Sequence, residues 1–214
     1  MAAFPNKAKI IYLYHELLEE FNKGPCAVGW FDGRAQQKGR FSSLLYLLNY
    51  LPPRKKLRLL DVGCGLGDLY EYLKKQGFLS RYKINYTGFD LSPDMIKKCR
   101  QRYPRVKFQV KDILGKEKIP RYDAVLASGI FNLRLADRRG DHLKWVSKIL
   151  RKMYGISCFG VAVDFQSKAD KVKRDRLEYA YDAKEIIKLC ERITPRFVLQ
   201  HYLNSFDYCL YLLK

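Results

Sequence analysis

The spacing of apolar residues changes repeatedly along the chain, and these changes predict alternating strands and helices. Short apolar runs are typical of buried strands, whereas apolar residues that recur every three or four positions indicate one face of a helix. The predicted strands cover residues 57–62, 84–89, 106–110, 122–127, 158–163, 196–203 and 206–213. The predicted helices cover residues 7–22, 34–50, 66–76, 140–154 and 183–192, and a further one opens at Pro93. This alternation favours an α/β fold with two antiparallel strands at its end.

Three glycines follow the first predicted strand, where the chain turns into a helix. Gly63, Gly65 and Gly67 give the spacing G-x-G-x-G, which is one residue shorter than the dinucleotide fingerprint G-x-G-x-x-G. Glycine allows a tight turn and a close approach of ligand to backbone. Asp68 follows in the first turn of the helix, where its charge would repel a pyrophosphate. A ligand without phosphate that carries an ammonium and a sulfonium would tolerate that carboxylate.

Acidic residues stand at the ends of the next two predicted strands. Asp90 ends the second strand, at the distance from the glycine turn where an acid accepts hydrogen bonds from ribose hydroxyls. The alternative for Asp90 is a capping or turn role. Asp112 follows the third strand, where its carboxylate could accept a hydrogen bond from the exocyclic amine of adenine. Leu91 and Met95 could offer an apolar face to the same base.

Composition restricts the class of protein. The 214 residues are 48% hydrophobic, enough for the core of one ordinary α/β domain. No apolar run is long enough to cross a bilayer, and residues 1–21 lack the apolar segment of a signal peptide. The six cysteines are scattered without a C-x-x-C pair, which predicts reduced thiols in a cytoplasmic protein and no metal site. We expect residues 1–53 to form a helical cap and residues 54–214 the cofactor-binding domain.

The basic composition leaves two interpretations open. The formal charge is +19, which would attract anions such as nucleic acid or acidic small molecules. Alternatively, the charge is a solvated surface, and the spread of the basic residues over several segments slightly favours this. Those segments are residues 54–58, 97–105, 134–152 and 168–176. RNA therefore stays among the candidate partners, and the sequence leaves the oligomeric state open.

Taken together, these motifs resemble those of the class I S-adenosylmethionine-dependent methyltransferases across nearly the whole chain. The glycine turn, Asp90, Asp112 and a final antiparallel strand occur in that family's order. The flanks resemble a narrower group of uncharacterised methyltransferase-like proteins, through residues 27–30, 36, 40–41, 128–133 and 193–196. The resemblance implies a Rossmann-like sandwich with a mostly parallel seven-stranded sheet, an antiparallel C-terminal strand and added N-terminal helices.

The resemblance also implies which residues hold S-adenosylmethionine and its product S-adenosylhomocysteine. Asp90 would hold the ribose, and Asp112 with the Ile113 backbone would hold adenine. Asp61 either supports the turn or reaches the cofactor's ammonium. Arg40 would bind the cofactor's carboxylate in bidentate fashion, or else form a surface ion pair. The full set is Arg40, Asp61, Gly63, Cys64, Gly65, Asp90, Leu91, Asp112, Ile113, Ser128 and Gly129.

The acceptor side of the predicted site has weaker signals. Aromatic faces near a sulfonium stabilise its charge by cation–π attraction. The aromatic candidates, for each of which core packing is the alternative, are Tyr14, Trp30, Phe131 and Tyr181. The candidates for a base or for orienting the acceptor are His15, Asn132 and Asp164. We expect His142 to lie on the surface and His201 to have a structural role.

The expected activity is in-line transfer of a methyl group to an unidentified nucleophile. The compact length, without a separate RNA-binding module, and the aromatic N-terminal flap favour a small-molecule acceptor. RNA methylation through the basic surface is one alternative, and a non-catalytic cofactor-binding subunit is another. The loop over residues 128–133 is not of the N-P-P-Y type, which disfavours planar amines of adenine, cytosine and glutamine as acceptors.

Overall fold

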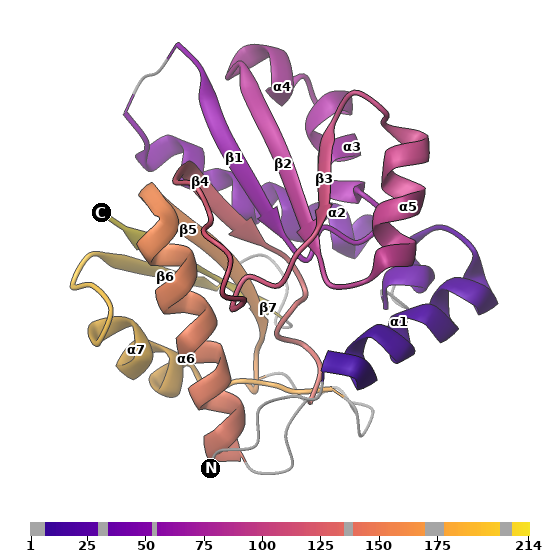
Figure 1. The fold of residues 1–214 in the computed structure, drawn as a ribbon. Coiled ribbons are helices and arrows are strands. Elements are labelled where there is room, and N and C mark those ends of the chain that lie inside the picture. Colours follow the sequence, from indigo (N-terminus) through magenta and orange to yellow (C-terminus); the bar gives the residue numbers. More distant parts are fainter. Residues whose placement is uncertain (1–6, 30–33, 53–54, 135–138, 170–177, 202–206) are drawn as a thin grey trace.

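A seven-stranded sheet runs through the computed structural model, with helices on both of its faces (Figure 1). The structure describes residues 7–29, 34–52, 55–134, 139–169, 178–201 and 207–214. The strands are β1 (Leu57–Val62), β2 (Ile84–Asp90), β3 (Lys107–Val110), β4 (Tyr122–Ala127), β5 (Ser157–Gln166), β6 (Phe197–His201) and β7 (Asp207–Leu213). Their order across the sheet is β3-β2-β1-β4-β5-β7-β6.

The direction of the strands confirms the predicted sheet. The pairs β1–β2, β1–β4, β2–β3 and β4–β5 are parallel, while β7 runs antiparallel to both β5 and β6. Residues of β1 pair in register with β2 from Leu57 opposite Ile84 to Val62 opposite Phe89. The carboxyl ends of β1 to β5 therefore meet at one edge of the sheet, where open α/β folds bind their ligands.

Two helical layers bury the two faces of the sheet. The helices are α1 (Lys7–Phe21), α2 (Arg34–Leu45), α3 (Asp68–Lys75), α4 (Phe78–Arg81), α5 (Pro93–Arg102), α6 (Arg139–Ile156) and α7 (Ala183–Glu191). One core joins β1, β4 and β5 to α6 and α7, through fully buried residues such as Val125, Leu150 and Ile186. The other core joins the sheet to α2, α3 and α5, through Leu44, Leu73 and Ile96.

Helix α1 lies beyond the carboxyl ends of the central strands (Figure 1). A small apolar cluster holds it there, in which Leu18 packs with Ala27, Leu66 and Met95. Ala27 belongs to a 3-10 helix, η1 (Pro25–Val28), that follows α1. The chain thus places its N-terminal helix over the same edge of the sheet that carries the glycine turn.

Several element boundaries differ from the sequence prediction. The second helix ends at Leu45 and continues as a 3-10 helix, η2 (Tyr46–Tyr50). Strand β5 extends to Gln166 instead of residue 163, because β7 pairs with it along its whole second half. Helix α4 was not predicted. The aromatic flap predicted over residues 26–33 overlaps η1 at residues 26–28, and residues 30–33 lie outside the described part of the chain. Among the described helices, none has the length and apolar character needed to cross a membrane.

Candidate active site

A cavity of about 840 Å³ opens at the carboxyl edge of the sheet, with α1 along one side. The ends of β1 to β5 and helices α1, α2 and α6 contribute to its wall. All eleven predicted cofactor-binding residues line it, namely Arg40, Asp61, Gly63, Cys64, Gly65, Asp90, Leu91, Asp112, Ile113, Ser128 and Gly129. The sequence therefore located the cavity correctly, while the role of each residue in binding stays a prediction.

The glycine turn is held by the end of the neighbouring strand β2. The backbone N–H groups of Gly63 and Cys64 donate to the Phe89 carbonyl at 2.8 and 3.0 Å. Gly63 has φ 74° and Gly65 has φ 51°, a region that side chains other than glycine rarely adopt. Local backbone conformation alone thus explains why this turn needs glycine.

Neighbouring side chains also lie close to the glycine turn. A Cβ atom at Gly63 would collide with Cγ2 of Ile130, and one at Gly65 would lie 2.9 Å from Cγ1 of Val28. Gly67 faces the protein interior, where Phe108 lies within 3.2 Å of the position of its absent Cβ. The glycines therefore serve protein packing as well as the cavity, a constraint that the sequence analysis did not anticipate.

Asp90 connects the glycine turn to the start of α5. Its Oδ2 accepts from Gly65 N–H and its Oδ1 from Ser92 N–H, both at 2.9 Å. Burial raises the pKa of this carboxyl, and the backbone hydrogen bonds oppose that rise. Each carboxylate oxygen can accept more than one hydrogen bond. Asp90 can therefore still accept hydroxyl hydrogen bonds from the cavity.

Asp112 and Asp61 face the cavity from opposite sides of Asp90. Asp112 accepts from Leu114 N–H at 2.9 Å and also forms an ion pair with Lys7 of α1. Asp61 is 2% exposed and accepts from the Tyr86 hydroxyl at 2.5 Å. Burial raises the pKa of Asp61 to about 7, although the Tyr86 hydrogen bond favours its ionised form. Asp61 thus titrates close to neutral pH.

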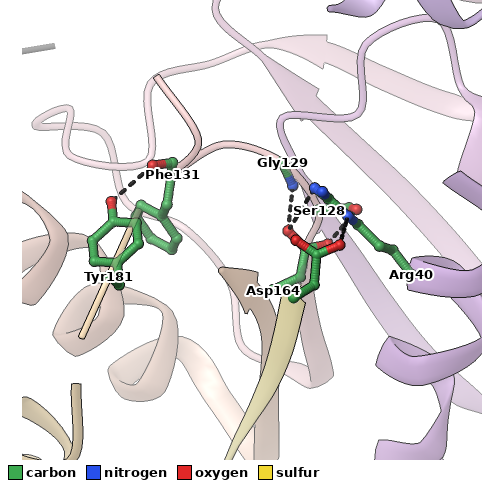
Figure 2. A network of polar contacts seen from close by, with 7 residues as sticks. Arg40, Ser128, Gly129, Phe131, Asp164 and Tyr181 are labelled. Carbon is green, nitrogen blue, oxygen red and sulfur yellow. Dashed lines mark hydrogen bonds and ion pairs between the residues drawn. The ribbon is translucent and has the colours of Figure 1, made fainter. Parts of the chain in front are cut away.

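Arg40 forms a buried ion pair, so the alternative of a surface ion pair is wrong, while its predicted contact with the cofactor's carboxylate stays a prediction. Its Nε donates to Asp207 Oδ2 at 2.5 Å, and its guanidinium lies 4.0 Å from Asp164 (Figure 2). Arg40 is 6% exposed and still contributes to the cavity wall. The guanidinium therefore joins α2 to β5 and β7, whatever it binds in the cavity.

Asp164 does not line the cavity, contrary to its prediction as a catalytic candidate. Its Oδ2 accepts from the Ser128 hydroxyl at 2.5 Å and its Oδ1 from Gly129 N–H at 2.8 Å (Figure 2). Burial raises its pKa, and the charge of Arg40 is the main opposing influence. Asp164 thus fixes the loop after β4, and Ser128 and Gly129 are the residues that reach the cavity.

Two of the predicted aromatic candidates belong to the core instead of the cavity. Phe131 is fully buried and stacks on Phe165 with ring centroids 5.1 Å apart. Tyr181 is fully buried and donates its hydroxyl to the Phe131 carbonyl at 2.7 Å (Figure 2). Tyr14 lines the cavity, and burial beside the Asp90 charge raises its pKa. Trp30 lies outside the described residues.

The histidines also differ from expectation. His15 does not line the cavity, because its Nδ1 lies 3.1 Å from Asp94 at the surface. His142 was expected on the surface but is fully buried, with its Nε2 2.6 Å from the Tyr181 hydroxyl. Burial lowers the pKa of His142 to about 4, so it is neutral at pH 7. His201, predicted to be structural, is exposed at the end of β6.

The acceptor side of the cavity includes residues that the sequence analysis missed. Asn132 lines the cavity as predicted, and Gln166, Glu178 and Trp145 join it. Tyr179 N–H donates to the Asn132 carbonyl at 2.8 Å, which holds this segment beside the loop after β4. Gln166 ends β5, so the rule applied to Asp90 and Asp112 would have found it had the strand been predicted at full length. Glu178 follows a polar stretch without any such signal.

The fold and the cavity define a class of protein: α/β enzymes that bind a nucleoside cofactor at the carboxyl ends of their strands. Residues 59–153 match the family model described as a methyltransferase domain. The chain is 35% identical over 156 residues to "Putative methyltransferase Rv1506c" of Mycobacterium tuberculosis, covering 71% of this chain and 86% of that protein. The chain therefore belongs to the class I S-adenosylmethionine-dependent methyltransferases.

Two further comparisons show what else the chain is similar to. It is 30% identical over 175 residues to the malonyl-(acyl-carrier protein) O-methyltransferase of Acetivibrio thermocellus, covering 75% of this chain and 59% of that protein. Its fold matches the crystal structure of magnesium protoporphyrin IX methyltransferase from Synechocystis PCC 6803 with bound S-adenosylmethionine, with a TM-score of 0.67 and 16% identity. That match covers 100% of this chain and 99% of the other, and it concerns the fold alone.

Proposed function

We propose that the cavity binds S-adenosylmethionine between the glycine turn and the carboxylates of Asp90 and Asp112, and that the acceptor is a small molecule. The observation that carries the proposal is the opening of both carboxylates and the turn onto one cavity. Leu91 and Ile113 beside them provide apolar surface for a base. Carboxylates that accept hydrogen bonds, flanked by apolar side chains, fit the hydroxyl and amine donors and the apolar base of an adenosine group.

The protein's own residues then have positioning roles. The cofactor supplies a methyl group that is already activated for transfer. Asp164 holds Ser128 and Gly129 in place through two hydrogen bonds, and these two residues form part of the cavity wall. Helix α1 supplies Tyr14 and other side chains that restrict the entry of water. A fixed wall and exclusion of water favour alignment of donor and acceptor.

The volume of the cavity and the name of a structural neighbour favour a small molecule as the methyl acceptor. The cavity is about 840 Å³ in volume, within the range of sites for cofactor-sized ligands. One structural neighbour, by its name, methylates magnesium protoporphyrin IX. We retain the division into a cap (residues 1–53) and a cofactor-binding domain (residues 54–214) as part of the proposal. We also expect segment 165–182 to contribute to the acceptor cover, although its residues 170–177 lie outside the described part of the chain.

S-Adenosylhomocysteine at about 100 times its Kd should raise the melting temperature by about 5–10 °C. Binding to the folded state alone causes this rise. Incubation with a methyl-labelled donor and cell extract should then place label in the small-molecule fraction. Label in the RNA fraction would overturn the small-molecule assignment, and a melting temperature unchanged by the ligand would overturn the cofactor site.

The affinity for S-adenosylhomocysteine should rise as the pH increases through about 7. Burial raises the pKa of Asp61 to about 7, so this carboxyl is neutral at lower pH and ionised at higher pH. Only the ionised carboxylate attracts the ligand's ammonium group. Calorimetry at intervals on either side of neutrality measures the change in Kd.

Two controls isolate the contribution of Asp61. The Asp61→Asn variant should bind with an affinity that hardly changes over the same range of pH. 5′-Methylthioadenosine, which lacks the ammonium group, should show the same flat profile with the unchanged protein. An equal pH dependence for both ligands would show that Asp61 supports the turn and does not contact the ammonium.

A further inference from the structure

The positive charge of the chain is not concentrated at the cavity. The lining includes four cationic residues, Lys7, Arg40, Lys111 and Lys148, and five carboxylates, Asp61, Asp68, Asp90, Asp112 and Glu178. Three of these cations also pair with carboxylates of the chain, since Lys7 pairs with Asp112, Arg40 with Asp207 and Lys111 with Glu117. The formal charge of +19 must therefore be concentrated elsewhere on the molecule.

Much of this charge gathers at the opposite edge of the sheet. Exposed cations stand just before five strands: Lys55 and Lys56 before β1, Lys83 before β2, Arg105 before β3, Arg121 before β4, and Arg196 before β6. These strands all run in one direction, so their amino ends share one edge (Figure 1). Antiparallel β7 ends at the same edge with exposed Lys214. We call this set the amino-edge row.

The geometry of the sheet brings these scattered positions into one row, to which every strand except β5 contributes. Seven neighbouring strands with a spacing of about 4.8 Å span about 29 Å. Within the described part of the chain, none of the six cations that precede strands forms an ion pair with a carboxylate. Arg196 donates to the main-chain oxygen of Lys214, and Arg121 donates to that of Ser157 at 3.1 Å. The row is therefore a positive surface that side-chain carboxylates of the described residues do not neutralise.

Two exposed aromatic rings lie beside the amino-edge row. Tyr46 and Tyr50 of η2 are 40% and 41% exposed, with ring centroids 5.8 Å apart. Leu47, between them, packs on Gly160 near the start of β5, which places η2 at the amino edge. Both rings also pack on Tyr211 of β7, with centroids 6.2 and 5.8 Å apart. Their exposed parts, at the same edge as the cations, suit a ligand that offers both phosphates and unpaired bases, because bases stack on aromatic faces.

We propose that the amino-edge row with Tyr46 and Tyr50 binds single-stranded nucleic acid, at the edge of the sheet opposite the active-site cavity. The phosphates lie along the cations and one or more bases stack on the tyrosines. The surface is a docking site for a partner, so it is independent of which molecule accepts the methyl group. Charge complementarity favours nucleic acid over an acidic protein because an acidic protein gives the tyrosines no bases to stack on.

The proposal is tested by binding of a fluorescent 12-residue oligouridylate at several salt concentrations. The logarithm of the association constant should fall linearly with the logarithm of salt, with a slope of about −0.7 for each phosphate neutralised. The double variant Lys55→Gln, Lys56→Gln should reduce that slope by about 1.4. Tyr50→Leu should weaken binding about fivefold or more with little change in slope.

A matched variant separates the row from general charge. Lys9→Gln, Lys184→Gln removes the same charge from exposed positions on α1 and α7 and should leave the slope nearly unchanged. The affinity for S-adenosylhomocysteine should stay constant in all these variants, and the melting temperature should stay constant in the two lysine double variants. These readings distinguish a failure of this surface from a failure of the cofactor site.

Three results would overturn the proposal. The first is an absence of oligouridylate binding at low salt. The second is an equal loss of slope in the two double variants, which would mean diffuse charge attraction. The third is binding of polyglutamate, or of vesicles containing phosphatidylserine, as tight as that of the oligouridylate, which would indicate a general polyanion surface.

Discussion

Replacing Arg40 by methionine should lower the free energy of unfolding by about 3–5 kcal/mol. Arg40 is 6% exposed, its Nε bonds to Asp207 at 2.5 Å, and it lies 4.0 Å from Asp164. The substitution leaves two buried carboxylates without this cation, and their lost hydration is then no longer offset. Urea denaturation near neutral pH measures the change.

A surface ion pair gives the matched control for Arg40. Arg139 pairs with Glu185, and these side chains are 43% and 31% exposed, so Arg139→Met should cost at most about 1 kcal/mol. The loss of unfolding free energy caused by Arg40→Met should be smaller in mild acid than near neutral pH. Burial raises the pKa of Asp164 and the Arg40 charge opposes this, so losing Arg40 raises that pKa further and protonation then favours the folded state.

The same experiment separates two roles for Arg40. The resemblance assigned this guanidinium to the carboxylate of the cofactor, whereas the structure places it between Asp164 and Asp207. A variant that unfolds like the unchanged protein but no longer binds S-adenosylhomocysteine would contradict the structural role. A destabilised variant that still binds the ligand when folded would contradict the assignment from the resemblance.

The parts of the fold that could be predicted are those with a clear local pattern of apolar and polar residues. Strands β1 and β4 were predicted with their observed bounds, because each is a short run bounded by polar or turn residues whose side chains are nearly all buried. The end of β5 was missed because residues 164–166 continue the strand only by pairing with β7, far along the chain. Helix α4 has four residues, too few for a helical period to register.

The same distinction between local pattern and distant contacts applies to the residues of the site. Positions fixed by the end of a strand, such as Asp90 and Asp112, could be located because parallel strands bring their ends together. The position of a residue at a strand end does not predict the direction in which its side chain points. Asp164 also follows the strand that was predicted over residues 158–163, yet it turns toward Ser128 and Gly129. His142 is buried by Tyr179 and Tyr181, which come from a segment without a periodic pattern.

Replacing Asp90 by asparagine should weaken binding of S-adenosylhomocysteine about 10- to 100-fold, which corresponds to about 1–3 kcal/mol. The variant loses the charge that strengthens hydrogen bonds from hydroxyl groups. It also retains one carbonyl oxygen for the two backbone donors that Asp90 now binds, Gly65 N–H and Ser92 N–H. An amide N–H₂ facing either donor would disturb the glycine turn. Calorimetry on the folded variant measures the affinity.

Asp123 offers the matched control for Asp90. It is also a buried aspartate, 2% exposed, and accepts from the Arg58 backbone N–H at 2.7 Å, but it does not line the cavity. Asp123→Asn should lower stability and leave the affinity for S-adenosylhomocysteine unchanged, because its hydrogen bonds with Arg58 join β1 to β4, away from the cavity. An Asp90→Asn protein that binds the ligand as tightly as the Asp123→Asn protein would mean that the ribose does not lie at the end of β2.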